Sequence, residues 1–353
     1  MHQIYDVNNL VFWSEEEIEE RARLAEAFSA AMRRFLQDRN RAWRFERVES
    51  PMLIPRELLS EEYDEDKIFA IPPRATSIRL PAARALSADR AAFDRLASHL
   101  PPDFDIENAW AQVAIAALDE AAAAAWDRRL DPLALAWARS ANRAPKELAL
   151  RPETTPATYA WMARRLSEKA TLLPYCCWQL AKSFRREQDQ SSRHMRLKEF
   201  WQEEFQCAHS SDTLDDWQAV LAPQVKELIA ELTRCPARLV VSDRLPAYSV
   251  CTVDVEVWNS QKWMEICSIS KRVDFPLDAP IPQKANAPAR EALVVEVATS
   301  PDRQYHCQRL WRPAWENLPR EAWIDHDLTP ALVSNQAAAE LRAAWRASRE
   351  PKP

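Results

Sequence analysis

The chain has 353 residues and contains no glycine. Average usage near 7% would supply about 25 glycines, and their chance absence has a probability on the order of 10⁻¹¹. Glycine has therefore been removed by selection or by design. With 47% hydrophobic and 28% charged residues, the remaining composition excludes a collagenous or a disordered chain. The net charge of −6 argues against wholesale coating of nucleic acid, while a local basic groove is compatible with it.

Cysteine usage and hydrophobic run lengths predict the compartment. The seven cysteines are odd in number and show no CxxC pairing, so we expect no disulfide framework. The first ten residues do not have the pattern of a signal peptide, and no apolar run approaches the roughly 18 residues needed to span a bilayer. These features predict a soluble, cytoplasmic protein without membrane contact.

The N-terminal part of the chain predicts a helix followed by a strand. Ser14 and Glu17 have the spacing of a capping box, and apolar residues recur at three- and four-residue steps after them. We expect one amphipathic helix over about 15–38 and a strand over 44–50. Pro51 and Pro55 prevent a helix in the next segment.

Residues 72–146 are rich in alanine and arginine and predict a helical insertion. The simplest interpretation is a solvated structural elaboration. Its arginines could also contact nucleic acid phosphates, although interspersed acids favour the solvated reading. These arginines are Arg74, Arg79, Arg84, Arg90 and Arg95.

From residue 147 onward, strand patterns dominate. Val253, Val255 and Val257 alternate with polar residues, which is typical of a half-buried strand. The run 293–297 is apolar except for Glu296, and a lone buried acid is costly unless it is paired or bound to a metal. Residues 330–353 predict a short helix and a polar end.

Two segments, Lys182–Glu187 and Arg196–Phe205, predict a β-hairpin that carries chemistry. Alternation places Arg185 and Glu187 on one face. On the return strand, one face holds Arg196, Lys198, Phe200, Gln202 and Glu204. Guanidinium groups, carboxylates and an aromatic ring together suit a purine nucleotide. A solvated hairpin with cross-strand charge pairs is the alternative.

The hairpin resembles motif 2 of class II aminoacyl-tRNA synthetases, an FRxE strand followed by an R-x-[RK]-E-F strand. Three further segments resemble parts of the same family in the required order. Residues 45–53 resemble motif 1, residues 151–154 resemble the RPET substrate loop of glycyl-tRNA synthetases, and residues 294–303 resemble motif 3. The resemblance implies an α+β fold, in which an antiparallel sheet is flanked by helices and carries the helical insertion.

Within the class, the motifs are most similar to those of glycyl-tRNA synthetases. Leu173–Arg185 resembles that family's LPF…QIGKSFRNE segment, and Trp263–Phe275 resembles its W-x-E-x…GIADRTDY segment. The implied organisation is a motif 1 part over 1–71, the insertion over 72–146, the core with motifs 2 and 3 over 147–328, and a C-terminal helix and tail over 329–353.

The resemblance also implies a role for each candidate residue. Arg185 and Arg303 would be catalytic and bind ATP together with Glu187, Arg196 and Phe200. The substrate amino acid would be bound by Glu153, Glu204 and Arg272. Mg²⁺ would be held by Glu265 and Glu296. A homodimer is implied as well, because the motif 1 proline lies at the dimer interface in the family.

The chain departs from the glycyl pattern at several positions. Family glycines are replaced by Ala181, Ser268 and Ser300, and a side chain at such a position costs about 1 kcal/mol or obstructs substrate. Lys271 replaces an acid beside Arg272, and Ala298 replaces the motif 3 serine near the substrate ammonium.

Fifty residues follow Arg303, too few for the anticodon-binding domain of about 100 residues that follows motif 3 in the family. We therefore expect tRNA contact, if any, at the acceptor stem.

The expected function is ATP-dependent activation of a small amino acid, glycine first, followed by transfer to tRNA. Three alternatives are open: a carrier protein or small molecule as acceptor, a non-catalytic regulatory paralogue, and an engineered glycine-free variant of a natural synthetase.

Overall fold

The computed structural model describes residues 5–7, 10–59, 67–71, 78–141, 147–168, 173–186, 197–211, 213, 215–242, 245, 248–258, 262–272, 292–311 and 334–349. The chain divides into two compact units. The first comprises residues 1–52, 63–68 and 151–353, and the second comprises residues 53–62 and 69–150.

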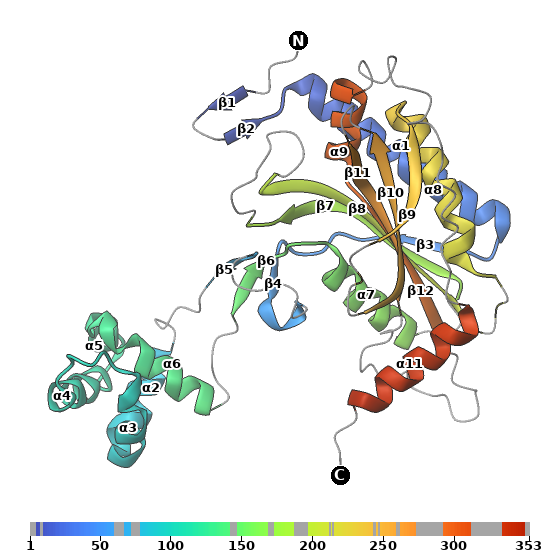
Figure 1. The fold of residues 1–353 in the computed structure, drawn as a ribbon. Helices are drawn as coiled ribbons and strands as arrows, with labels where there is room; N and C mark the ends of the chain where they lie inside the picture. The colour runs from blue at the N-terminus through green and yellow to red at the C-terminus, as the bar shows by residue number, and fades with distance from the viewer. Residues whose placement is uncertain are drawn as a thin grey trace. The chain divides into compact units, whose positions relative to one another are not determined.

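The first unit is built on a seven-stranded sheet with the order β3-β7-β8-β12-β11-β10-β9 (Figure 1). Only β3 is parallel to its neighbour, β7, and the other adjacent pairs are antiparallel. The strands are β3 (Arg44–Arg47), β7 (Tyr175–Phe184), β8 (Glu199–Ser210), β9 (Ala237–Val241), β10 (Ser249–Trp258), β11 (Trp263–Arg272) and β12 (Ala292–Thr299). This confirms the α+β fold class with an antiparallel sheet flanked by helices.

One face of the sheet is covered by α1 (Glu15–Arg39) and α8 (Trp217–Thr233) (Figure 1). Apolar side chains of both helices pack on alternate residues of the strands, and this layer is the main core of the unit. Its members include Phe28 and Met32 of α1 and Val253, Val255 and Val257 of β10. The alternation expected for this strand is thereby confirmed.

The opposite face, which we call the site face, packs against α7 (Thr155–Glu168). Tyr159 and Met162 of α7 contact Cys177, Ala208 and Val294 of the sheet. The site face also carries polar side chains from the middle strands. Because side chains alternate along each strand, one face holds the apolar core while the other presents buried polar groups.

Local signals in the sequence explain where α1 begins. The Ser14 side chain accepts a hydrogen bond from the Glu17 backbone, and the Glu17 side chain accepts one from the Ser14 backbone at 2.7 Å. This reciprocal pair satisfies donors that a helix N-terminus leaves without partners. The helix expected over 15–38 is confirmed. The remaining elements of this unit are β1 (Tyr5–Val7), β2 (Leu10–Phe12), α9 (Pro301–His306) and α11 (Asn335–Arg349).

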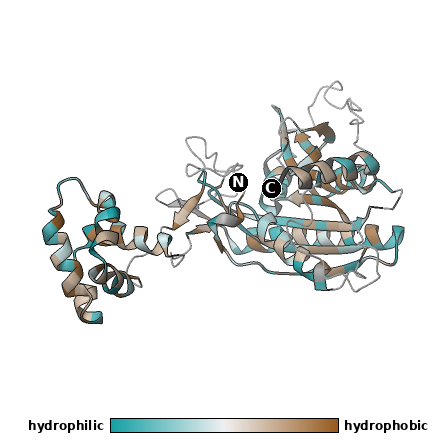
Figure 2. Ribbon diagram, turned by 90° about the horizontal axis from the view of Figure 1, so that it is seen from below, coloured by the Kyte–Doolittle hydropathy of each residue, from teal (hydrophilic) through white to brown (hydrophobic). Residues whose placement is uncertain are grey.

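The second unit combines helices with a small sheet. Its helices are α2 (Arg79–Ala88), α3 (Arg90–Leu96), α4 (Ile106–Ala116), α5 (Glu120–Ala125) and α6 (Asp131–Ser140). They enclose a separate apolar core, and Figure 2 shows hydrophobic and hydrophilic residues alternating along them. The unit also contains β4 (Leu53–Pro55), β5 (Phe69–Ile71) and β6 (Leu148–Leu150). The expected boundaries at 72 and 146 leave out these strands, because three-residue strands carry too little periodic signal to be recognised.

Among the described helices, none has both the length and the apolar character that a membrane span requires.

The backbone of the described residues makes little demand for glycine. One described residue, Arg234 at the end of α8, has a positive φ, with φ 55° and ψ 36°. By contrast, Ala181 and Ser268 lie in extended strands, and Ser300 is the extended N-cap of α9 with φ −122°. The backbone of this chain therefore requires no positive φ at these three positions.

Replacing Arg234 by glycine should stabilise the protein by about 1 kcal/mol, because a Cβ atom disfavours the left-handed conformation. The measurement is urea-induced unfolding at neutral pH. Arg234→Ala is the matched control, since it removes the side chain but keeps the Cβ atom, and it should give no such gain. Equal stabilisation by both substitutions would show that the arginine side chain, not the backbone, is the source of strain.

Candidate active site

Two arginines and a ring lie toward one end of the sheet, which we call the arginine end, and strand alternation places Arg185 and Phe200 there on the site face. Arg185 directly follows β7, and its guanidinium carbon lies 5.3 Å from the centre of the Phe200 ring on β8. Its Nε donates to the carbonyl of Pro152 at 3.0 Å. Arg303 lies in α9, which directly follows β12, and its Nη1 donates to the carbonyl of Glu265 at 3.2 Å. Of the other expected nucleotide ligands, Glu187 and Arg196 lie outside the described residues.

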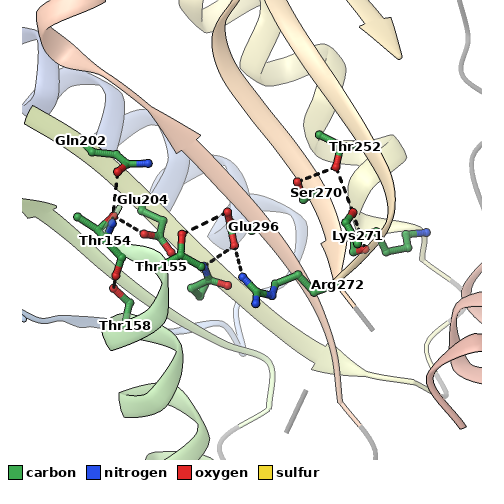
Figure 3. Close-up of polar contacts among 12 residues, drawn as sticks. Thr154, Thr155, Thr158, Gln202, Glu204, Thr252, Ser270, Lys271, Arg272 and Glu296 are labelled. Atoms are coloured by element: carbon green, nitrogen blue, oxygen red, sulfur yellow. Dashed lines mark hydrogen bonds and ion pairs between the residues drawn. The ribbon is translucent and has the colours of Figure 1, made fainter. Parts of the chain in front are cut away.

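Further along the same face, charged groups form a buried network (Figure 3). Arg272 Nη1 donates to Glu296 Oε2 at 2.6 Å, and both side chains are almost fully buried. Gln206 Nε2 donates to Glu296 at 2.9 Å and also to Glu204. The hydroxyl of Thr154 donates to Glu204 as well. Figure 3 shows the threonines at the start of α7 directed toward these two carboxylates.

We call Glu153, Glu204 and Glu296 the acid cluster. Burial, together with the neighbouring charges of Glu296 and Glu153, raises the pKa of Glu204 to about 8. Glu204 is fully buried, so its charged form lacks the stabilisation that water would give. At neutral pH it is therefore unfavourable for all three carboxyl groups of the cluster to be ionised at once. A cation entering it would stabilise the carboxylates and release a proton.

The cluster is held by two glutamines to which the sequence analysis assigned no role in the site. Gln179 on β7 accepts from the Ser50 backbone at 3.2 Å and donates to the Thr154 carbonyl at 3.0 Å. The side-chain oxygen of Gln202 accepts from the Thr154 backbone at 3.3 Å and from Ser183 Oγ at 2.8 Å. These bonds fix the start of α7, and thereby its threonines, over the two carboxylates.

Arg151 makes the connection between the motif 1 segment and motif 2. Its Nη1 donates to the carbonyl of Pro51 at 3.0 Å and its Nε donates to the carbonyl of Lys182 at 2.7 Å. The side chain is buried. A planar fork that satisfies several backbone carbonyls is a geometry that lysine cannot reproduce. The resemblance to the RPET loop predicted a role for Glu153 in binding the substrate. It predicted no role for Arg151, because nothing in the sequence pattern indicates that this side chain binds backbone carbonyls.

The two carboxylates expected to hold Mg²⁺ do not come together. Glu296 pairs with Ser270 on β11, and Glu265 lies five positions before Ser270 on that strand, which is roughly 13–17 Å along a strand that carries a bulge. The Glu296 carboxylate instead bonds Arg272, on the other side of Ser270. Among the described residues, no group of three or more His, Cys, Asp or Glu side chains could hold a metal ion. Glu296 therefore belongs to the acid cluster, and magnesium binding by Glu265 and Glu296 stays a prediction.

Lys271, which stands where the glycyl pattern has an acid, has a structural role. Its ammonium pairs with Asp216 Oδ1 at 2.7 Å, and its side chain is buried. Asp216 is the N-cap of α8, on the face opposite the acid cluster. Lys271 therefore stabilises the packing of α8, and the substitution does not alter the surroundings of Arg272. Ala298, which pairs with Glu204 across β12 and β8, remains on the site face.

Comparison with known proteins agrees with this architecture. Residues 138–290 match the family model described as the tRNA synthetase class II core domain (G, H, P, S and T). No curated protein sequence matches the chain.

Two crystal structures of prolyl-tRNA synthetase from Cryptosporidium parvum are similar in fold. One is complexed with halofuginone and AMPPNP and has a TM-score of 0.50, and the other is complexed with L-proline and AMP and has a TM-score of 0.51. Both share 10% sequence identity with this chain and cover 86% of it. The chain spans about half of their length, 48% and 49% respectively.

These findings agree on the fold. Residues 138–290 match the class II tRNA synthetase core domain model, and the sheet with its flanking helices has the fold of that class. The five amino acids in the family description include glycine, but no match singles it out.

Glu204→Gln should stabilise the protein at alkaline pH. The pKa of Glu204 rises from 4.5 to about 8 on folding, so the stability that this group contributes is complete below pH 4.5 and is lost as pH rises through 8. The neutral amide avoids this loss, and we expect a gain near zero at pH 5 and about 1–3 kcal/mol at pH 8.5. Urea unfolding at both pH values measures it.

Glu227→Gln, at an exposed position on α8, is the control and should change stability by less than about 0.5 kcal/mol at either pH. Destabilisation by Glu204→Gln at pH 8.5 would contradict the assignment of a proton to this carboxyl group.

Proposed function

We propose that this protein activates a small amino acid with ATP as an aminoacyl-adenylate and transfers it to tRNA, with glycine as the first candidate. The observation that carries the proposal is the order of groups on the site face. Cations and a ring occupy the arginine end, and buried acids with one arginine follow along the same strands. This order matches the two reactants of adenylation, a nucleotide triphosphate and a zwitterion.

The arginine end suits ATP. Phe200 would stack on the adenine, and Glu187 would accept from its amino group. Arg185 would bind the α-phosphate and Arg303 the γ-phosphate, with Arg196 beside them. AMPPNP and AMP are bound in the two prolyl enzymes of similar fold, which is consistent with this arrangement.

The acid cluster suits the amino acid. A substrate ammonium would replace the proton of Glu204 and bind between Glu153, Glu204 and Glu296, where neighbouring carboxylates raise the pKa of Glu204. The substrate carboxylate would bind Arg272, whose guanidinium carries five N–H donors. Glu296 thus takes a place in the amino acid site, where it orients Arg272 and contributes to ammonium binding.

The reaction follows from this placement. An oxygen of the amino acid carboxylate attacks the α-phosphorus of ATP, the bond from that phosphorus to the bridging oxygen breaks, and pyrophosphate leaves. Arg185 stabilises the negative charge that develops on the α-phosphate oxygens, and the fixed position of both reactants lowers the entropic part of the barrier. Mg²⁺ would accompany the ATP phosphates. Of the two expected ligands, Glu265 and Glu296, Glu265 lies at the arginine end and is the candidate for contact with it.

The acceptor and the assembly are further parts of the proposal. The 3′ end of tRNA is the first candidate acceptor, because residues 138–290 match a family model of tRNA synthetases. A carrier protein or a small molecule is the alternative acceptor. The resemblance of residues 45–53 to motif 1 supports a homodimer.

Amino-acid-dependent exchange of pyrophosphate into ATP tests the activity. We expect exchange with glycine and at least tenfold less with histidine, proline, serine and threonine, the other amino acids of the family description. Arg185→Ala should lower the rate by about 10²-fold or more, because one charge that stabilises the transition state is lost.

Arg186→Ala is the matched control, since Arg186 is exposed, and it should keep most of the rate. Exchange with proline alone would contradict glycine as the substrate and favour the amino acid of the two prolyl enzymes of similar fold. Exchange without tRNA charging would favour another acceptor, and no exchange with any of the twenty amino acids would favour a non-catalytic paralogue.

A further inference from the structure

The arginine of the acid cluster is enclosed by two aromatic rings. The guanidinium carbon of Arg272 lies 4.0 Å from the centre of the Tyr159 ring and 3.7 Å from the centre of the Tyr248 ring. Tyr159 belongs to α7, and Tyr248 directly precedes β10. We call the three residues the tyrosine–arginine stack.

The two distances define how the rings lie. A ring that met the guanidinium edge-on would have its centre further away, because a nitrogen atom would stand between ring and carbon. Both rings therefore cover flat faces of the guanidinium, and one face accommodates only one ring at this distance. Arg272 lies between Tyr159 and Tyr248, with one ring on each face.

The stack restricts what Arg272 can do. Attraction between a cation and a ring is strongest when the cation is desolvated, and Arg272 is buried. With both faces covered and Nη1 bonded to Glu296, the guanidinium can neither rotate nor move out of its plane without losing these contacts. A ligand carboxylate must approach its edge, in the plane of the N–H donors.

We propose that Tyr159 and Tyr248 are positioning residues for the substrate amino acid: they hold Arg272 in the one orientation that binds the substrate carboxylate beside Glu296. This inference rests on the proposed function, since it concerns the same amino acid site. It assigns a role to two residues that no motif in the sequence marks.

Tyr248 offers the cleaner test, because it is half-buried, whereas Tyr159 is part of the core around α7. Tyr248→Ala should raise KM for the amino acid at least tenfold in pyrophosphate exchange and leave KM for ATP and kcat within threefold. Tyr248→Phe keeps the ring and should restore KM for the amino acid to within threefold of the unmodified protein.

Trp161→Ala is the matched control. Trp161 lies on the same helix as Tyr159 and also contacts an arginine, Arg165, whose guanidinium carbon is 6.0 Å from its ring centre. Because this pair lies outside the acid cluster, the substitution should leave KM for the amino acid unchanged. The proposal is overturned if Tyr248→Ala leaves this KM unchanged, or if Tyr248→Phe raises it as much as Tyr248→Ala does.

A second measurement does not depend on activity. Protons of a guanidinium between two rings are shifted upfield by ring currents, so the Arg272 side-chain signal should be upfield in nitrogen-15 NMR spectra. Arg272→Lys identifies the signal by removing it. The shift should persist in Tyr248→Phe and decrease in Tyr248→Ala.

The two measurements separate the possible failures. An unmodified protein without exchange activity but with the upfield signal would contradict the proposed function and support the stack. An active protein without the upfield signal would overturn the stack and leave the proposed function intact.

Discussion

The buried contact between Arg272 and Glu296 is the interaction on which the site depends. It places one positive and one negative group, 2.6 Å apart, in the middle of a sheet that excludes water. Removing one partner of such a pair leaves an uncompensated charge, which is strongly unfavourable. Glu204 is buried beside them with a raised pKa, and perturbed carboxyl groups of this kind are common at functional sites, which supports the proposed amino acid site.

The sheet makes this arrangement possible by separating two tasks. One face carries the apolar core with α1 and α8, and it provides the rigidity. The other face carries the hydrogen-bonded glutamines and threonines that hold the acid cluster. Lys271 and Arg272 illustrate the separation, since neighbouring cations serve opposite faces. Lys271 stabilises α8 through Asp216, and Arg272 takes part in the site.

Much of the fold could be predicted from the sequence, because the signals were local. The capping box defined the start of α1, and alternation identified β10 and the hairpin of β7 and β8. Motif order then brought Arg185, Phe200 and Arg303 to one end of the sheet. The position of Glu296 could not be predicted, since a lone acid in an apolar strand is equally compatible with a metal and with an arginine partner. Register across three strands is what places Arg272 and Gln206 beside Glu296.

Other features depend on contacts that no linear pattern contains. Tyr159 and Tyr248 are 89 residues apart in the sequence, and only the folded chain brings both rings to Arg272. Arg151 likewise joins carbonyl groups from segments about 100 and 31 positions away. Such residues are recognised in a structure by what they touch.

The single left-handed residue among those described, Arg234, has a consequence for the unfolded chain as well. Where a fold requires hardly any left-handed backbone, glycine contributes nothing to the native state that other residues lack, yet it gives the denatured ensemble more conformations to lose on folding. A polypeptide drawn from nineteen residue types therefore begins folding from a smaller set of conformations. In the described part of the chain, which has one residue with positive φ, the absence of glycine thus lowers the entropy of the unfolded state at little cost to the folded one.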